Sequence, residues 1–295
     1  MIDLHMHTNH SDRTDTVEEL LKNAENSNLE IISITDHDSI DAYYELKKYP
    51  EIRKLYKGII ITGTELKTYF DDISIEVLAY GCDYEKLNIH KVDTKTLQET
   101  NIESFRKVLD REGFKYDPDE LYIDLSNPTK HYAGDVVGRE IKRHPENDEL
   151  VKKFGEFTPE IFFRIHQCNK NSVFYINECK HYLGLEETIE RIHEAGGLAF
   201  LAHGYIYPFE EKDAAIEKIL RTTDIDGIEC EYPLFSQEQR EKAKELAKKY
   251  NKFMSGGSDY HAKAKPNTKL GTGIDNNLNI PKELINNWID KVRKV

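Results

Sequence analysis

The chain has 295 residues, of which 38% are hydrophobic, 10% aromatic and 32% charged. This aromatic content excludes a disordered chain, and the length allows one large domain or two smaller ones. The 54 acidic and 41 basic residues give a net charge of −13, which argues against a protein that binds duplex nucleic acid by its phosphates. Small phosphorylated ligands are still allowed, because bound divalent cations can reverse the local field.

The cysteines and the hydropathy pattern bear on location. Four cysteines lie far apart without a C-x-x-C motif, which predicts reduced thiols in a cytoplasmic protein. No apolar run reaches 18 residues, and the first motif begins at Asp3, so neither a transmembrane helix nor a signal peptide is expected. We expect a cytoplasmic protein without a membrane partner, present as a monomer or weak homo-oligomer.

Short apolar runs recur along the chain and end in polar residues. Helical patterns at 17–28, 187–195 and 237–250 separate some of them, and such alternation predicts a parallel sheet or barrel. In that class the active site lies at the carboxyl ends of the strands. The seven expected strands are Ile2–Met6, Glu30–Thr35, Gly58–Thr62, Ile73–Tyr80, Leu198–Ala202, Ile225–Cys230 and Phe253–Ser258.

Residues 91–184 interrupt this alternation with amphipathic helical segments such as Leu97–Glu112. We therefore expect residues 1–90 and 185–295 to form the barrel, and residues 91–184 to form a helical insertion domain. Insertions at the active-site face of barrels commonly shape the substrate pocket, so this domain is expected to act as a cap.

Two alternating pairs of polar residues follow or end expected strands. His5 and His7 form one pair and Asp259 and His261 the other, and alternate residues of a strand share a face. Single candidates near other strand ends are Asp12, His37, Glu65 (after a Gly-Thr turn) and His203.

Each of these signals alone would fit a structural polar residue, but together they indicate a metal centre. Histidine and carboxylate ligands without cysteine favour Mn²⁺, Fe²⁺ or Zn²⁺, and more than four ligands imply more than one ion. Clustered divalent ions suit the hydrolysis of phosphate esters.

The motifs resemble those of the PHP (polymerase and histidinol phosphatase) domain family. They are DLHMHTNHSD (3–12), ITDHDS (34–39), GTE (63–65), LAHG (201–204), GIECEYP (227–233) and GGSDYH (256–261). The resemblance implies an α/β fold, a distorted (β/α)7 TIM-like barrel. Within the family, the sequence is similar to the branch of nucleoside-bisphosphate phosphatases and short-oligonucleotide 5′-exonucleases, which also carries a helical insertion after the fourth strand.

The resemblance also implies two or three divalent ions, with manganese favoured over iron or zinc. The ligands would be His5, His7, Glu65 and Asp259 for the first ion, Asp12, His37 and His261 for the second, and Glu65, residue 76 and His203 for the third. A metal-bound hydroxide would attack the phosphate, with His203 and Asp259 as catalytic residues. The leaving oxygen would take its proton from metal-bound water or from His203.

The chain departs from the family pattern at two places. Position 76 is Glu, where the family usually has His; we expect Glu76 to remain a ligand, since Ile75 and Val77 would face away from the pocket. The family's Arg-Pro-His-x-Ala element corresponds to TKHYA (129–133), which lacks the Arg-Pro pair. The residues expected to bind substrate phosphate are Lys130, His131 and Arg139.

The sequence thus predicts a metal-dependent phosphoesterase. It would hydrolyse phosphomonoesters of small nucleotides, such as 3′,5′-bisphosphates, or the 5′ ends of short oligonucleotides. One alternative is a phosphatase of histidinol phosphate or another sugar or polyol phosphate. Another is a PHP module that binds metal without catalysis.

Overall fold

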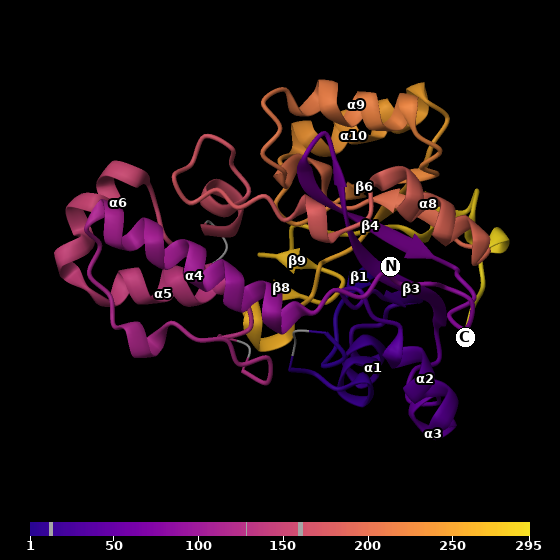
Figure 1. Ribbon diagram of the computed structural model, residues 1–295. Helices are drawn as coiled ribbons and strands as arrows, with labels where there is room; N and C mark the ends of the chain where they lie inside the picture. The colour runs from indigo at the N-terminus through magenta and orange to yellow at the C-terminus, as the bar shows by residue number, and fades with distance from the viewer. Residues whose placement is uncertain (12–13, 128, 159–161) are drawn as a thin grey trace. The chain divides into compact units, whose positions relative to one another are not determined.

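The computed structural model describes residues 1–295 with the exception of 12–13, 128 and 159–161. The chain divides into two compact units. The first comprises Met1–His90 and Tyr182–Val295, and the second comprises Lys91–His181 (Figure 1).

A seven-stranded sheet forms the centre of the first unit, with its strands side by side in chain order. They are β1 (Ile2–Met6), β2 (Ile31–Ile34), β3 (Ile59–Phe70), β4 (Ile73–Tyr80), β5 (Leu198–Leu201), β6 (Gly227–Glu231) and β7 (Phe253–Gly256). Just beyond β7, the carbonyl of Tyr260 accepts a hydrogen bond from His7 N–H at 3.0 Å, which brings the last strand back to the first. The sheet is therefore a nearly closed barrel, and the predicted α/β barrel class is confirmed.

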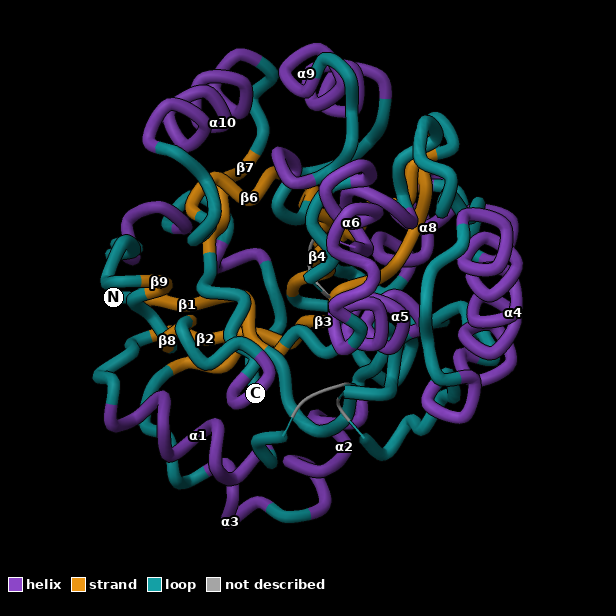
Figure 2. The backbone as a smooth tube through the Cα atoms, turned by 90° about the vertical axis from the view of Figure 1, so that its left-hand side faces the viewer, coloured by secondary structure: helices purple, strands orange, loops and turns teal. Residues whose placement is uncertain are grey.

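Helices surround this barrel, as Figure 2 shows. They are α1 (Val17–Asn26), α2 (Asp41–Lys48), α3 (Pro50–Arg53), α8 (Leu185–Glu194), α9 (Lys212–Thr222) and α10 (Gln237–Lys249). Thr16 and Glu19 form a capping box at the start of α1, and Ser236 and Gln239 form another at the start of α10. These boxes satisfy otherwise orphaned N–H groups and fix where each helix begins. A small separate sheet pairs β8 (Thr268–Lys269) with β9 (Gly273–Ile274).

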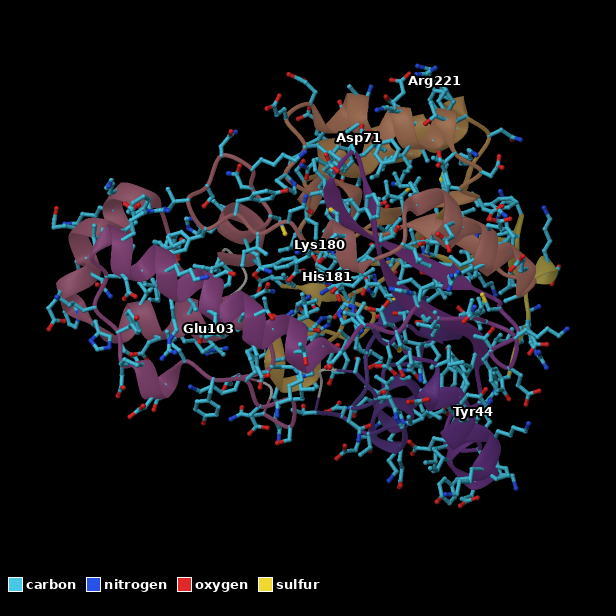
Figure 3. All side chains as sticks on the ribbon, viewed as in Figure 1. Tyr44, Asp71, Glu103, Lys180, His181 and Arg221 are labelled. Carbon is cyan, nitrogen blue, oxygen red and sulfur yellow. The ribbon has the colours of Figure 1, made fainter. Side chains whose placement is uncertain are left out.

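One strand contradicts the expectation of a parallel sheet. Strand β4 runs antiparallel to both β3 and β5, because β3 continues to Phe70 and turns directly into β4 without a helix. Asp71 and Asp72 adopt positive φ angles of 49° and 58°, which allow the tight turn. Asp71 lies at the tip of this hairpin (Figure 3) and pairs with Lys218 at 2.5 Å. The expected turn before Glu65 is likewise wrong, since Glu65 lies inside β3.

A buried carboxylate closes the seam of the barrel. Asp3 on β1 is fully buried and accepts hydrogen bonds from the backbone N–H and the hydroxyl of Ser258, at 2.9 and 2.6 Å. It also accepts one from Gly271 N–H at 2.7 Å. Because buried carboxylates need such partners, Asp3 ties the first strand to two segments that follow the last one.

The second unit is helical, with α4 (Thr94–Glu112), α5 (Ala133–Arg143) and α6 (Asp148–Phe154). Its core is aromatic and includes the buried side chains of Phe105, Phe157, Phe162 and Phe174. Glu178 is buried beside this core and accepts hydrogen bonds from the side-chain amides of Asn101 and Gln167.

Candidate metal centre

Glu65 on β3 lies at the centre of a cluster of histidines. Its Oε2 atom lies 3.2 Å from Nε2 of His5 on β1 and 3.4 Å from Nε2 of His7, directly after β1. The same oxygen lies 3.1 Å from Nδ1 of His37, and Oε1 lies 2.8 Å from Nε2 of His203. Since His5, His7 and Glu65 are almost completely buried, one carboxylate meets four imidazoles with little water nearby.

Asp259, in the segment after β7, lies beside His7 and His261. Its Oδ1 atom lies 3.3 Å from Nε2 of His7 and 3.1 Å from Nδ1 of His261. Its Oδ2 atom accepts hydrogen bonds from the hydroxyl of Tyr232 at 2.8 Å and from Nζ of Lys265 at 2.5 Å. The two oxygens thus have different surroundings: Oδ2 accepts two hydrogen bonds, and Oδ1 faces the imidazoles.

Glu76 reaches the cluster from the antiparallel strand β4. Its carboxylate oxygens lie 3.5 Å from Nε2 of His203 and 3.7 Å from Nδ1 of His37. In the β3–β4 register Glu76 is opposite Lys67, and Lys67 is two residues from Glu65, so the three side chains belong to one face of the sheet.

Two of the residues at this site have strained backbones. His203 has φ of 28° and Asp259 has φ of 52°, a region that residues other than glycine seldom adopt. Such conformations persist where the surrounding structure imposes them, and they cluster at functional sites.

Several polar atoms of the cluster suit metal ions. Within the described part of the chain, no hydrogen-bond partner exists for Nε2 of His5, either ring nitrogen of His7, Oε2 of Glu65, or Nδ1 of His203. Buried polar atoms are normally hydrogen-bonded, so a group of such orphans indicates an ion. Three sets of potential ligand atoms each lie within 4.8 Å of one another: His5, His7 and Glu65; His7, His37 and His261; and His37, Glu65 and Glu76.

The model of the PHP domain matches residues 3–258 of the chain. The chain belongs to the PHP domain family. The prediction of the family, and with it of a hydrolase acting on phosphate esters, is confirmed. Family membership and the His/Glu cluster together indicate divalent metal ions.

Curated relatives of this PHP protein act on phosphate esters. The chain is 25% identical over 267 residues to a 5′-3′ exoribonuclease of Haemophilus influenzae, covering 88% of this chain and 89% of that protein. It is 23% identical, again over 267 residues, to a phosphoribosyl 1,2-cyclic phosphate 1,2-diphosphodiesterase of Eggerthella lenta, covering 88% and 94%.

Two solved structures share the fold. One is a protein of Bifidobacterium adolescentis provisionally named a metal-dependent phosphoesterase, with a TM-score of 0.65 and 23% identity over 98% of this chain and 96% of that one. The other is an amidohydrolase of Chromobacterium violaceum with bound sulfate and no metal. Its TM-score is 0.67, with 20% identity over 92% and 89% of the two chains.

The electrostatics of the PHP centre reflect a surplus of carboxylates. Burial opposes the charged form of His5, yet the carboxylates of Glu65, Glu229 and Asp259 outweigh it and raise the pKa of His5 well above its usual value. Burial also opposes ionisation of Glu65, but His5, His37 and the hydrogen bond from His203 hold its pKa well below the usual range. The carboxylates therefore favour positive charge beside His5, as a site for cations should, whereas burial lowers the pKa of His7.

The structure brings together most of the predicted ligands. His5, His7, His37, Glu65, Glu76, His203, Asp259 and His261 all belong to the cluster. Asp12 lies outside the described residues.

The predicted substrate residues lie in the second unit. There Lys130 pairs with Glu120 at 2.9 Å, and Nδ1 of His131 lies 3.2 Å from the carbonyl of Leu125. Arg139 is exposed on α5. Their role toward substrate remains a prediction.

Three residues of the site were missed by the sequence reasoning. Glu229 on β6 is fully buried beside His5, whereas the strand-end Glu231 pairs outside the cluster with Lys244 at 2.7 Å. Tyr232 and Lys265 hold Asp259. The alternation of strand residues could have singled out Glu229, since it points to the opposite face from its apolar neighbours Ile228 and Cys230.

Among the residues that the structure describes, no helix is long and apolar enough to cross a membrane.

Proposed function

We propose that this PHP protein hydrolyses phosphomonoesters of small nucleotides, such as 3′,5′-bisphosphates, or the 5′ ends of short oligonucleotides. The observation that carries the proposal is the Glu65 carboxylate, which lies among four imidazoles with Oε2 lacking a hydrogen-bond partner in the described chain. The relatives that cleave RNA or a phosphoribosyl cyclic phosphate support a ribose-phosphate substrate.

We assign the metal ligands as follows. His5, His7, Glu65 and Asp259 would hold one ion, and His37, His261 and Asp12 a second; His203, Glu76 and Glu65 would hold a third. Glu65 would serve both the first and the third ion, because its two oxygens face different histidines. When bound, divalent ions would make water acidic and offset the charge of phosphoryl oxygens. Manganese suits the mixed oxygen and nitrogen donors that Glu76 completes.

The side chains around the cluster have tasks of their own. Asp259 would present its ionised Oδ1 to the ion and to the water beside it, while Tyr232 and Lys265 keep Oδ2 in place. Lys265 also brings a positive charge to a predominantly acidic site and would attract the phosphate of a substrate. His203, with its constrained backbone, would present its imidazole toward the leaving oxygen. Lys130, His131 and Arg139 of the helical insertion would contact the remainder of the substrate.

A substrate panel tests the proposal. The purified protein, with its metal content measured and Mn²⁺ added, is assayed with a nucleoside 3′,5′-bisphosphate, a 5′-phosphorylated trinucleotide, a phosphoribosyl cyclic phosphate and histidinol phosphate. We expect the highest kcat/KM for one of the first two. Preference for histidinol phosphate would favour the polyol phosphatase, and no turnover by metal-loaded protein would favour a non-catalytic module. Glu65→Gln is the inactive control.

A further inference from the structure

Glu229 is a buried carboxylate in β6 that contacts two of the proposed ligands at once. It is fully buried, and its Oε1 atom lies 3.0 Å from Nδ1 of His5 on β1. Its Oε2 atom accepts a hydrogen bond from the backbone N–H of His203, after β5, at 2.8 Å. Each oxygen of Glu229 therefore contacts a different segment of the barrel, one on β1 and the other directly after β5.

The contact with His5 decides which ring nitrogen carries the proton. A neutral imidazole has one N–H, and its other nitrogen is free to hold a cation. In His5 it is Nε2 that faces Glu65 and Asp259, at 3.2 and 3.6 Å, and that has no hydrogen-bond partner among the described residues. If Nε2 holds the ion, the proton must be on Nδ1, where it is donated to Glu229.

The hydrogen bond from His203 N–H to Glu229 stabilises a strained backbone conformation at His203. His203 has φ of 28° and ψ of 49°, outside the favoured regions for a residue with a side chain. Its N–H is an obligatory donor. By accepting it, Glu229 helps to keep the backbone in the conformation that turns the imidazole toward Glu65.

Glu229 thus faces one hydrogen-bond donor at each oxygen, and only a side chain with two acceptor atoms, a carboxylate, can satisfy both. An ionised Glu accepts at both oxygens, whereas the isosteric Gln accepts at one end and donates at the other. We propose that Glu229 is a positioning residue that fixes the Nδ1–H tautomer of His5 and the backbone of His203, so that both imidazoles are ready for metal. The inference rests on the proposed metal site.

The substitution Glu229→Gln tests it, with Glu231→Gln as the matched control. Glu231 lies on the same strand but pairs with Lys244 outside the cluster. The Gln amide must either donate to Nδ1 of His5, which moves the proton to Nε2, or face the His203 N–H with another donor. We expect Glu229→Gln to bind Mn²⁺ about 10- to 100-fold more weakly by titration calorimetry. Glu231→Gln should bind as the native protein does.

A second measurement reads the tautomer directly. In ¹⁵N-labelled native protein loaded with Cd²⁺, the His5 ring signals, identified by their loss in His5→Gln, should show protonated Nδ1 and metal-bound Nε2. A metal-bound or unprotonated Nδ1 would overturn the inference, and this readout decides the matter if Glu229→Gln fails to fold. Native affinity in Glu229→Gln would also overturn it, while leaving the proposed function intact. If the native protein binds no Mn²⁺, both fall.

Discussion

Gly257, directly after β7, packs closely against His5 on β1. A Cβ atom added to Gly257 would lie 2.4 Å from both the backbone N and the Cβ of His5, and 2.8 Å from its Cα. Ordinary contacts begin near 3.4 Å, so Gly257→Ala requires β1 to move by about 1 Å. The obstacle is the backbone and the Cβ of His5, which cannot rotate away.

We expect such a displacement to weaken metal binding more than it weakens the fold. His5 would move relative to Glu65, and a shift of about 1 Å in a site can cost on the order of 100-fold in activity. Overpacking should also lower the free energy of unfolding by about 1–3 kcal/mol. We expect Gly257→Ala to remain folded but to bind Mn²⁺ weakly, measured by titration calorimetry beside thermal unfolding.

Gly184→Ala is the control for this prediction. There an added Cβ would meet the ring of Tyr69 at 3.7 Å, an ordinary contact, and the backbone has φ of −67°. This variant should keep native metal affinity and stay close to native stability, because the lower unfolded-state entropy of Ala is offset by its weaker preference for the N-cap of α8. If Gly257→Ala binds Mn²⁺ as tightly as Gly184→Ala does, the reasoning about the seam is refuted.

Other predictions concern the ions and the charges around them. Glu76→Ala should lose one bound ion by elemental analysis, and unchanged stoichiometry would mean that Glu76 is not a ligand. Chelation with EDTA should abolish phosphatase activity and lower Tm, because a free ion concentration of 100 times the Kd adds about 2.7 kcal/mol to the free energy of unfolding. An unchanged Tm would contradict a buried ion site. Lys265→Met should raise KM for phosphomonoesters several-fold more than it changes Mn²⁺ affinity, whereas equal KM values in variant and native protein would exclude a role in phosphate binding.

Much of the barrel could be read from the sequence because its strands are short, apolar and spaced by helices. The pairs His5/His7 and Asp259/His261 were recognisable because alternate residues of an extended segment share a face. The direction of β4 was missed, although the ten residues between the expected strands 58–62 and 73–80 are too few for the crossover that parallel neighbours need. The positive φ angles of Asp71 and Asp72, which reverse the chain there, are only weakly encoded by residue type.

The residues that support the ligands were harder to predict than the ligands themselves. Glu229 lies in the middle of an apolar run, and its two partners come from residues 26 and 224 positions away. Tyr232 and Lys265 are ordinary in sequence and gain a task only where the folded chain brings them to Asp259. Such roles depend on long-range geometry, which a periodic pattern does not carry.

The seam formed by Asp3 has a consequence for how the protein is made. Asp3 accepts hydrogen bonds from Ser258 and Gly271, and His5 on the same strand and His7 directly after it face Asp259. During synthesis the amino-terminal strand leaves the ribosome more than 250 residues before these partners, so a nascent chain carries exposed histidines without a complete site. Only after residues 258–271 have emerged can Asp3 close the barrel and Asp259 meet the two histidines, so full metal binding at this cluster requires that the barrel has closed.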